Sequence, residues 1–464
     1  MTTTPADIAA SVTHPAGASF GRRTAAIVLV LVFLLSARAM WHRAGDLIID
    51  TGRELDTPRQ LAEGRMLYRD VRYWYGPLAP YFHALLYRLF GVHTDVLAAA
   101  GVGVAAATTW MIYRFARLLA CRAAAATAGN LARHGLAEIA ASRGESAYVV
   151  DCGAFYLASI TECLGTKALV ADAMRAITGR TYYDRIAQDT LAMAINDLVT
   201  VGATPVSVHA YWATGGSDWF ADEARARDLV EGWKAACDAC GVAWGGGETP
   251  ALAGVVMPGR IDLAASCVGI VRPKSRLALG DKLAAGDAIV LLASSGIHAN
   301  GVSLARKLAE RLPQGYATKL DDGALYGEAL LAPTVLYAPV TEAIAAAGIV
   351  PHYCANVTGH GWRKLMRHPG AFTYRIHTLP PVPPVLAFIQ RAAGIDARES
   401  YGNLNMGAGF ALYVADADAE RTVQVARAHG VDAWIAGRVE SGAKQIVIEP
   451  LSLTFAGEEL HVRV

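Results

Sequence analysis

The sequence predicts an α/β protein, with a mixed α/β region that begins near Tyr148 and follows a more apolar N-terminal segment. Two observations predict this class. Short β-rich runs alternate with longer helical patterns from Tyr148 onward. The two long apolar runs that raise the mean hydropathy to +0.29 both lie earlier in the chain. We therefore expect a folded α/β region preceded by a different kind of segment.

The N-terminal part is expected to be a disordered tail at residues 1–21 and a membrane segment at residues 22–117. Two apolar runs, Thr24–Met40 and Leu97–Tyr113, are each just long enough to cross a bilayer at ~1.5 Å per residue. The alternatives are a cleavable signal peptide for the first run, or a pair of buried helices.

Arginines flank the outer side of both runs, which places the rest of the chain in the cytoplasm under the positive-inside rule. We therefore expect an inner-membrane protein whose catalytic region faces the cytoplasm. Without the N-terminal segment, the expected location is the cytoplasm itself.

Residues 118–144 are alanine-rich and are expected to connect the membrane segment to the α/β region. That region divides near Val271 into halves at 145–272 and 273–464. Expected strands are Tyr148–Val150, Ala288–Leu292 and Phe410–Val414. Expected helices are Gln188–Val201, Ala221–Cys240 and Pro333–Ala347.

Charge and cysteine content narrow the functional classes. The formal net charge is +1, so overall charge does not favour nucleic acid as a partner. Seven cysteines, an odd number, favour a reducing compartment over a disulfide framework. Cys237 and Cys240 have metal-like spacing but no second pair, so we interpret them as core residues of a helix.

Three motifs combine acids, glycines and a lysine: Thr161–Lys167, Asn196–Leu198 and Gly245–Thr249. Carboxylate oxygens bind hard divalent cations, and glycines let backbone N–H groups approach phosphate oxygens. Lysine adds a point charge. The combination predicts a magnesium–nucleotide site.

These motifs belong to a longer ordered series over about Glu145–Glu449 that resembles aminoimidazole ribonucleotide synthetase (phosphoribosylformylglycinamidine cyclo-ligase). The other members of the series are Asp189–Leu198, Tyr211–Gly215, Cys267–Gly269, Ser294–Gly301, Leu331–Thr334, Val357–Trp362 and Asn405–Gly409. The resemblance implies two α/β halves, a homodimer, and the substrates ATP and formylglycinamidine ribonucleotide. It also implies ATP- and Mg²⁺-dependent phosphorylation of an amide oxygen, followed by closure of the imidazole ring.

Carried over residue by residue, the resemblance implies three sets of site residues. The metal ligands would be Glu162, Asp189, Asp197 and Glu248. The nucleotide would be bound by Gly165, Thr166, Lys167, Asn196, Gly246, Gly247 and Thr249. Catalytic contacts would come from Lys167, His298, Asn300 and His360.

Structural roles are the alternative for several of these residues. Asp189 could be an acid favoured by a helix dipole, and Asp197 could be a cap or a surface acid. Lys167 could be a solvated residue at a helix start. His298 could stabilise its own loop by a hydrogen bond.

The chain departs from the family pattern at the site. Glu162 and Cys163 stand where the family has aspartate and glycine, and Leu164 replaces a valine. Asn356 replaces a histidine that would be an acid–base candidate, a role for which nearby His360 could substitute. The N-terminal lid of the family is not recognisable.

Other functions stay open. The chain could be a different ATP-using member of the superfamily, such as a selenophosphate synthetase or thiamine-phosphate kinase relative, or a non-catalytic nucleotide-binding regulator tethered to the membrane. Residues 50–81 separately resemble the start of a polyprenyl-phosphate-sugar-dependent membrane glycosyltransferase, with Asp50 as its acid.

Overall fold

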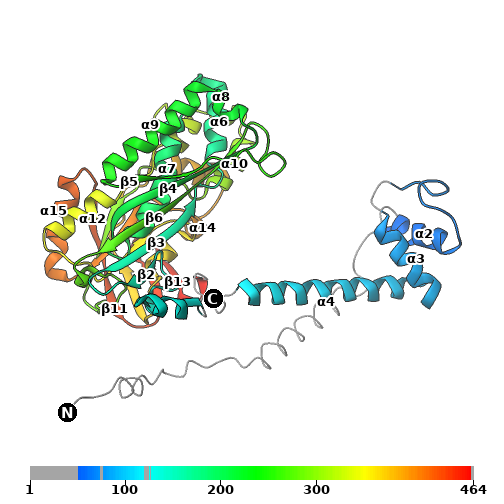
Figure 1. Cartoon of the computed structure of the whole chain (residues 1–464), viewed down its shortest axis with the longest axis horizontal. Helices are drawn as coiled ribbons and strands as arrows, with labels where there is room; N and C mark the ends of the chain where they lie inside the picture. Colours follow the sequence, from blue (N-terminus) through cyan, green and yellow to red (C-terminus); the bar gives the residue numbers. More distant parts are fainter. Residues whose placement is uncertain (1–50, 74–76, 120–124, 126, 461–464) are drawn as a thin grey trace, which may run out of the picture. The chain divides into compact units, whose positions relative to one another are not determined.

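The computed structural model describes residues 51–73, 77–119, 125 and 127–460 (Figure 1). The chain separates into two compact units, Met1–Ala123 and Ala124–Val464. The predicted tail at 1–21 and the first apolar run, Thr24–Met40, lie outside the described residues.

The first unit contains three described helices: α2 (Thr51–Ala62), α3 (Leu78–Phe90) and α4 (Thr94–Leu119). A small core formed by Leu61, Leu67, Val71, Tyr73 and Ala84 holds α2 against α3. The guanidinium of Arg88 donates to the carbonyl oxygens of Leu61 and Ala62 at 3.1 and 3.0 Å. It thereby satisfies carbonyls that the end of α2 leaves unpaired.

The expected second membrane-spanning helix is not supported. Its run, Leu97–Tyr113, lies within the 26-residue helix α4. Among the described residues, however, no helix combines the length and apolarity that a membrane crossing requires. The physical reason is composition: alanine, glycine and threonine make up most of the run, and these residues contribute far less transfer free energy than leucine or isoleucine.

The second unit contains two β-sheets. The first has the strand order β1-β2-β3-β6-β4-β5. Its strands are β1 (Ala137–Glu138), β2 (Tyr148–Asp151), β3 (Tyr156–Cys163), β4 (Thr204–Thr214), β5 (Ala243–Glu248) and β6 (Ile261–Val271). The helices between and beside them are α6 (Ala168–Thr178), α7 (Tyr183–Val199), α8 (Asp218–Ala221) and α9 (Glu223–Cys240).

The second sheet has the strand order β13-β12-β9-β11-β7-β10-β8. Its strands are β7 (Ala288–Ala293), β8 (Tyr353–Asn356), β9 (Phe372–Ile376), β10 (Ala408–Val414), β11 (Ala433–Ser441), β12 (Gln445–Ile448) and β13 (Leu453–Ala456). The accompanying helices are α10 (Val302–Ala309), α11 (Tyr326–Leu330), α12 (Ala338–Ala346), α13 (Pro384–Ala393), α14 (Ala397–Asn403) and α15 (Ala419–Ala428).

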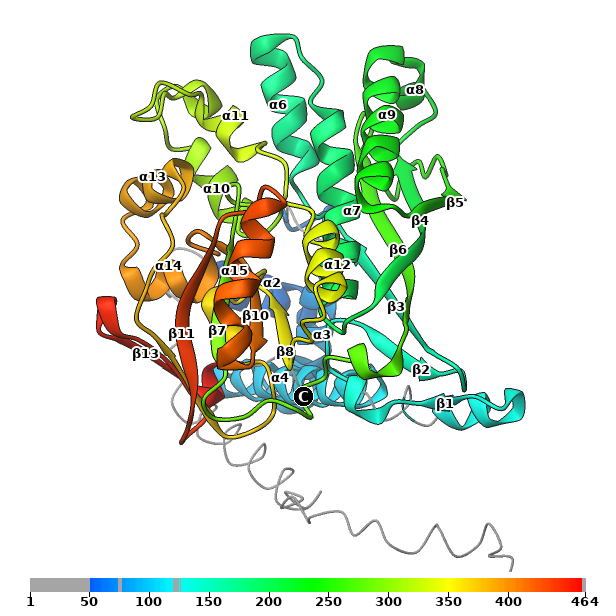
Figure 2. The same ribbon diagram turned by 90° about the vertical axis from the view of Figure 1, so that its left-hand side faces the viewer.

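Helix α7 is the central element of the second unit. It packs against β3, β4 and β6 of the first sheet, and it also contacts α12 and β8 from the second half (Figure 2). Almost every face of α7 is therefore buried. Polar side chains on such a helix need internal partners, because an unpaired buried polar group costs about 1–3 kcal/mol.

The sheets follow the burial pattern that their sequences require. In β6, buried residues alternate with more exposed ones, as expected when one face packs on helices and the other is partly open. In β10 every residue is buried. One continuous hydrophobic core runs through the elements of both sheets.

The observed elements overlap those expected from the sequence, with one informative shift. The expected helix at Pro333–Ala347 starts only at Ala338. The four residues Thr334–Tyr337 are instead a loop, because their backbone groups bind polar side chains of α7.

Candidate functional site

Two of the predicted metal ligands, Glu162 and Asp197, form one electrostatic cluster. Glu162 lies near the end of β3 and is half-buried, whereas Asp197 is a buried residue of the last turn of α7. The side-chain amide of Asn356 at the end of β8 donates to Oδ1 of Asp197 at 2.7 Å. The cluster thus joins a strand of the first sheet, the central helix and a strand of the second sheet.

The environment of Glu162 favours its protonated form. Burial, and then the negative charge of Asp197, raises its pKa to about 7, while Lys364 and Arg367 act in the opposite direction. Two carboxylates that influence each other in this way are suited to a cation, which would relieve their repulsion.

Lys364 and Arg367 are members of the cluster that sequence reasoning missed. Both are 9% exposed, and both come from the short helical segment Gly361–Met366 and the residue after it. The charge of Lys364 interacts with Asp197 and Glu162. The sequence signal was available in Arg363-Lys364-Leu365-Met366-Arg367, directly after the Val357–Trp362 motif, but basic residues in a helix are usually solvated.

Arg367 holds the segment Gly144–Ser146, which precedes β2. Its guanidinium donates to Gly144 O at 2.8 and 3.2 Å and to Ser146 Oγ at 2.7 Å. It also lies 3.6 Å from Glu145 Oε2. Tyr353 of β8 donates to the same carboxylate at 2.8 Å. The buried guanidinium of Arg367 therefore holds the segment Gly144–Ser146 next to the cluster.

Lys167 and Asp189 form a separate, fully buried ion pair. Lys167 Nζ lies 2.7 Å from Asp189 Oδ2, and both side chains are completely shielded from solvent. The backbone N–H and the hydroxyl of Thr334 donate to Asp189 Oδ1 at 2.8 and 2.6 Å. Lys167 Nζ also donates to Ala332 O at 3.1 Å. The pair therefore fixes the Leu331–Thr334 loop against α6 and α7.

Burial shifts the pKa of both members of this pair. Desolvation is the main influence on both groups and moves each pKa towards the neutral form, downwards for Lys167 and upwards for Asp189. Their mutual attraction opposes that shift. Both side chains therefore have a partner within the protein. Their roles in phosphate and metal binding stay predictions.

Asn196 continues this attachment about two turns further along α7. Its amide group donates to Val335 O at 2.8 Å, and its carbonyl oxygen accepts from the N–H of Tyr337 at 2.9 Å. Gln188 adds a bond to Thr334 O at 2.8 Å. Asn196 thus lies beside the cluster, with both ends of its side chain bonded to backbone.

The three remaining predicted catalytic residues lie on loops of the second half. His298 is buried with a left-handed backbone, and its Nε2 accepts the N–H of Ser295 at 3.2 Å. Burial lowers its pKa to about 3. Asn300 Oδ1 accepts the N–H of Gly359 at 3.1 Å, which links its loop to the one that carries His360. His360 is exposed and also has a left-handed backbone.

The glycine motifs differ in their surroundings. Gly165 (φ +74°) and Gly246 (φ +115°) have left-handed backbones with open space where a Cβ would stand. At Gly247 a Cβ would stand 2.0 Å from the carbonyl oxygen of Ala210, so this glycine is required for the pairing of β5 with β4. Thr166 is half-buried, whereas Glu248 and Thr249 are exposed at the end of β5.

A magnesium ion fits part of the predicted ligand set. Glu162 and Asp197 provide hard carboxylate oxygens in one cluster, but Asp189 is committed to Lys167 and Thr334. Glu248 lies on a different, exposed strand. Among the described residues no group of three or more histidine, cysteine or carboxylate side chains could hold a metal. Further ligands would have to be phosphate oxygens, water or groups outside this set.

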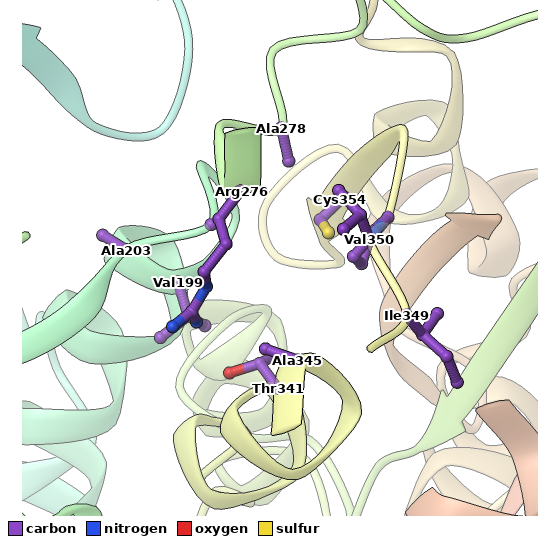
Figure 3. A pocket seen from close by; sticks show the side chains of 11 residues that line it. Val199, Ala203, Arg276, Ala278, Thr341, Ala345, Ile349, Val350 and Cys354 are labelled. Atoms are coloured by element: carbon purple, nitrogen blue, oxygen red, sulfur yellow. The ribbon is translucent and has the colours of Figure 1, made fainter. Parts of the chain in front are cut away.

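A pocket lies elsewhere in the second unit and contains none of the predicted site residues. It is lined by the end of α7 and the residues after it, the segment around Arg276, α12, and the chain that leads into β8 and includes Cys354 (Figure 3). Arg276 Nη2 forms an ion pair with Glu342 Oε1 at 2.7 Å. The pocket is therefore distinct from the Glu162–Asp197 cluster.

Comparison with known proteins gives the family. Residues 144–271 match the N-terminal domain, and residues 284–449 the C-terminal domain, of AIR synthase related protein. The chain is 35% identical over 292 residues to a phosphoribosylformylglycinamidine cyclo-ligase of Methanocaldococcus jannaschii. The matched residues cover 62% of this chain and 80% of that protein.

Two further relatives carry the same name. The one from Carboxydothermus hydrogenoformans is 34% identical over 63% of this chain and 83% of its own length. The one from Sorangium cellulosum is 36% identical over 61% of this chain and 80% of its own length. The matched domains and this level of identity together show that the chain belongs to the AIR synthase family.

Proposed function

We propose that the chain is an ATP- and Mg²⁺-dependent cyclo-ligase that closes the imidazole ring of aminoimidazole ribonucleotide from formylglycinamidine ribonucleotide. The observation that carries this proposal is the similarity to proteins of that name over at least 80% of their length in the relatives compared. The grouping of Glu162, Asp197, Asn356 and Lys364 also supports this proposal. It brings charged side chains together where the motifs Thr161–Lys167, Asn196–Leu198 and Val357–Trp362 meet.

The proposed reaction explains why such a cluster is useful. Phosphorylation turns the amide oxygen of the substrate into a good leaving group. An amidine nitrogen then attacks the amide carbon, the carbon–oxygen bond to phosphate breaks, and inorganic phosphate leaves. Phosphoryl transfer needs positioning and neutralisation of negative charge more than covalent help from the protein.

Within this proposal, Glu162 and Asp197 would hold Mg²⁺, which neutralises phosphate charge when it is bound. The left-handed turns at Gly165 and Gly246 leave room for a ligand near the backbone. His360 is exposed and would be the candidate for proton transfer, whereas the neutral, buried imidazole of His298 orders the Ser295–Asn300 loop. Lys167 and Asp189 would act indirectly, by fixing the Leu331–Thr334 loop.

The change of histidine to Asn356 is compatible with this assignment. An asparagine amide donates to Asp197 without adding a charge. It keeps Asp197 oriented but cannot move a proton at neutral pH. Proton transfer would then have to come from another group, for which His360 is the candidate. The homodimer implied by the family resemblance stays a prediction.

The test is turnover by the purified full chain. It would be incubated with ATP, Mg²⁺ and formylglycinamidine ribonucleotide, and both ADP and the aminoimidazole product would be measured. We expect equal amounts of the two products, and none without Mg²⁺. ADP release only with a different acceptor would favour a sister activity of the superfamily. Nucleotide binding without turnover would favour a regulatory protein.

The control variant for this assay is Lys234→Met. Lys234 is an exposed residue of α9 whose ion pair with Asp238 lies on the surface. Its loss should leave turnover unchanged. Glu162→Gln should instead abolish the Mg²⁺-dependent part of ATP binding. Unchanged Mg²⁺ dependence in Glu162→Gln would reject Glu162 as a metal ligand.

A further inference from the structure

Lys364 is an unpaired cation inside the candidate site. Its side chain is only 9% exposed. Among the residues that the structure describes, it makes no hydrogen bond and no ion pair within 4 Å. The carboxylates whose charges act on it include Asp197 and Glu162. The ammonium nitrogen is not one of the described side-chain atoms that are both fully buried and unpartnered, so it keeps contact with solvent at the site. A largely buried lysine whose donors have no protein partner can offer them to an anionic ligand.

The other cations near the site already have partners. Lys167, which the sequence assigned to phosphate neutralisation, is held by Asp189 and by Ala332 O. Arg367 has its donors on Gly144 and Ser146. Lys364 is therefore the cation of this cluster whose donors remain available.

Its position suits a phosphoryl oxygen. A cation bound by Glu162 and Asp197 would draw phosphate oxygens towards the same carboxylates, and the charge of Lys364 interacts with that pair. Lysine binds phosphate as a point charge with three rotatable donors. The side chain also comes from the segment that follows the glycine-containing turn at Thr358–Gly361, so it approaches the cluster from the second half of the protein.

We propose that Lys364 is the residue that contacts a phosphoryl oxygen of the bound substrates, in the role that the sequence suggests for Lys167. This inference rests on the proposed function and adds a specific substrate-binding residue to it. The phosphoryl group could belong to ATP or to the 5′-phosphate of the ribonucleotide. Both present the same chemistry to an ammonium group.

The test is ligand binding by the full chain, measured by isothermal titration in two arms. One arm uses a non-hydrolysable ATP analogue with Mg²⁺, and the other uses formylglycinamidine ribonucleotide. We expect Lys364→Met to weaken one of the two ligands by roughly tenfold to a hundredfold, the range for a lost charged hydrogen bond. Lys364→Arg should restore most of the affinity, and the surface control Lys234→Met should bind like the wild type.

The arms identify the source of the phosphoryl group. A loss confined to the ATP analogue places Lys364 at the nucleotide, and a loss confined to the ribonucleotide places it at the 5′-phosphate. Wild-type affinity of Lys364→Met for both ligands would overturn the inference while leaving the cyclo-ligase proposal intact, provided that the wild type turns over. A wild type that binds neither ligand would overturn both.

Folding is checked separately so that a misfolded variant is not mistaken for a binding defect. The thermal melting temperature of each variant is measured before titration. Lys364→Gln, which keeps a polar side chain of similar length, replaces the methionine variant if the latter does not fold. It should show the same loss, because an amide cannot supply the positive charge; unchanged affinity in this variant would reject the role.

Discussion

Asp189→Asn should destabilise the protein strongly, because it leaves the ammonium of Lys167 buried without a counter-charge. The substitution keeps the size of the side chain and an acceptor for Thr334. It removes only the negative charge that lies 2.7 Å from Lys167 Nζ, where both groups are 0% exposed. Breaking such a buried pair costs about 3–5 kcal/mol.

The assay is urea unfolding at pH 7, followed by tryptophan fluorescence and circular dichroism. The matched control is Asp238→Asn, which breaks the exposed Lys234–Asp238 pair at 2.5 Å; the free energy of unfolding should change there by less than about 1 kcal/mol. A double variant, Lys167→Met with Asp189→Asn, should be more stable than Asp189→Asn alone, because both charges are then gone.

Two results would refute this reasoning. A free energy of unfolding for Asp189→Asn within about 0.5 kcal/mol of the wild type would show that the buried pair is not structural. The second is a double variant whose loss equals the sum of the single losses, since that would exclude coupling. If Asp189 were instead a metal ligand, Asp189→Asn would weaken Mg²⁺ binding and leave stability nearly unchanged.

Three further predictions concern Glu162, His298 and the glycines. The pKa of Glu162 is raised to about 7 in the folded protein, so the contribution of this carboxyl group to stability is lost as pH rises from 4.5 to 7. In urea unfolding, Glu162→Gln should therefore gain stability relative to the wild type over that pH range. Because the pKa of His298 is lowered to about 3, its ring should stay neutral by NMR down to pH 4, and its contribution to stability should fall as pH drops below 6.5; a ring titrating near 6.5 would contradict its burial. Gly247→Ala should lower the melting temperature more than Gly165→Ala, because only the former meets a backbone oxygen, that of Ala210; equal losses would show that β5 can shift.

The sequence predicted the α/β class and several strands correctly, because local apolar runs determine them. Ala288–Leu292 and Phe410–Val414 are continuous apolar runs, and both are buried strands in the structure. The start of α12 could not be predicted from local pattern. Thr334–Tyr337 is withdrawn from that helix by side chains of α7 that lie far away in sequence.

The candidate site was only partly predictable for the same reason. The motifs identified Glu162 and Asp197, but no spacing rule shows that Asp189 pairs with Lys167 or that Asn356 reaches Asp197. These contacts depend on how the two halves pack. Lys364 was missed because its burial is a property of the fold, and the Leu97–Tyr113 run was over-interpreted because alanine-rich apolar sequence also suits an ordinary helix.

The anchorage of Arg367 has a practical consequence for any shortened version of this protein. The acceptors of its guanidinium include Gly144 O and Ser146 Oγ, at the very beginning of the matched family domains. A fragment that starts after Ser146 would leave the buried guanidinium of Arg367 without these acceptors, next to the candidate site. We expect such a fragment to be destabilised even though every motif residue remains. The start of an expressed fragment should therefore lie upstream of Gly144.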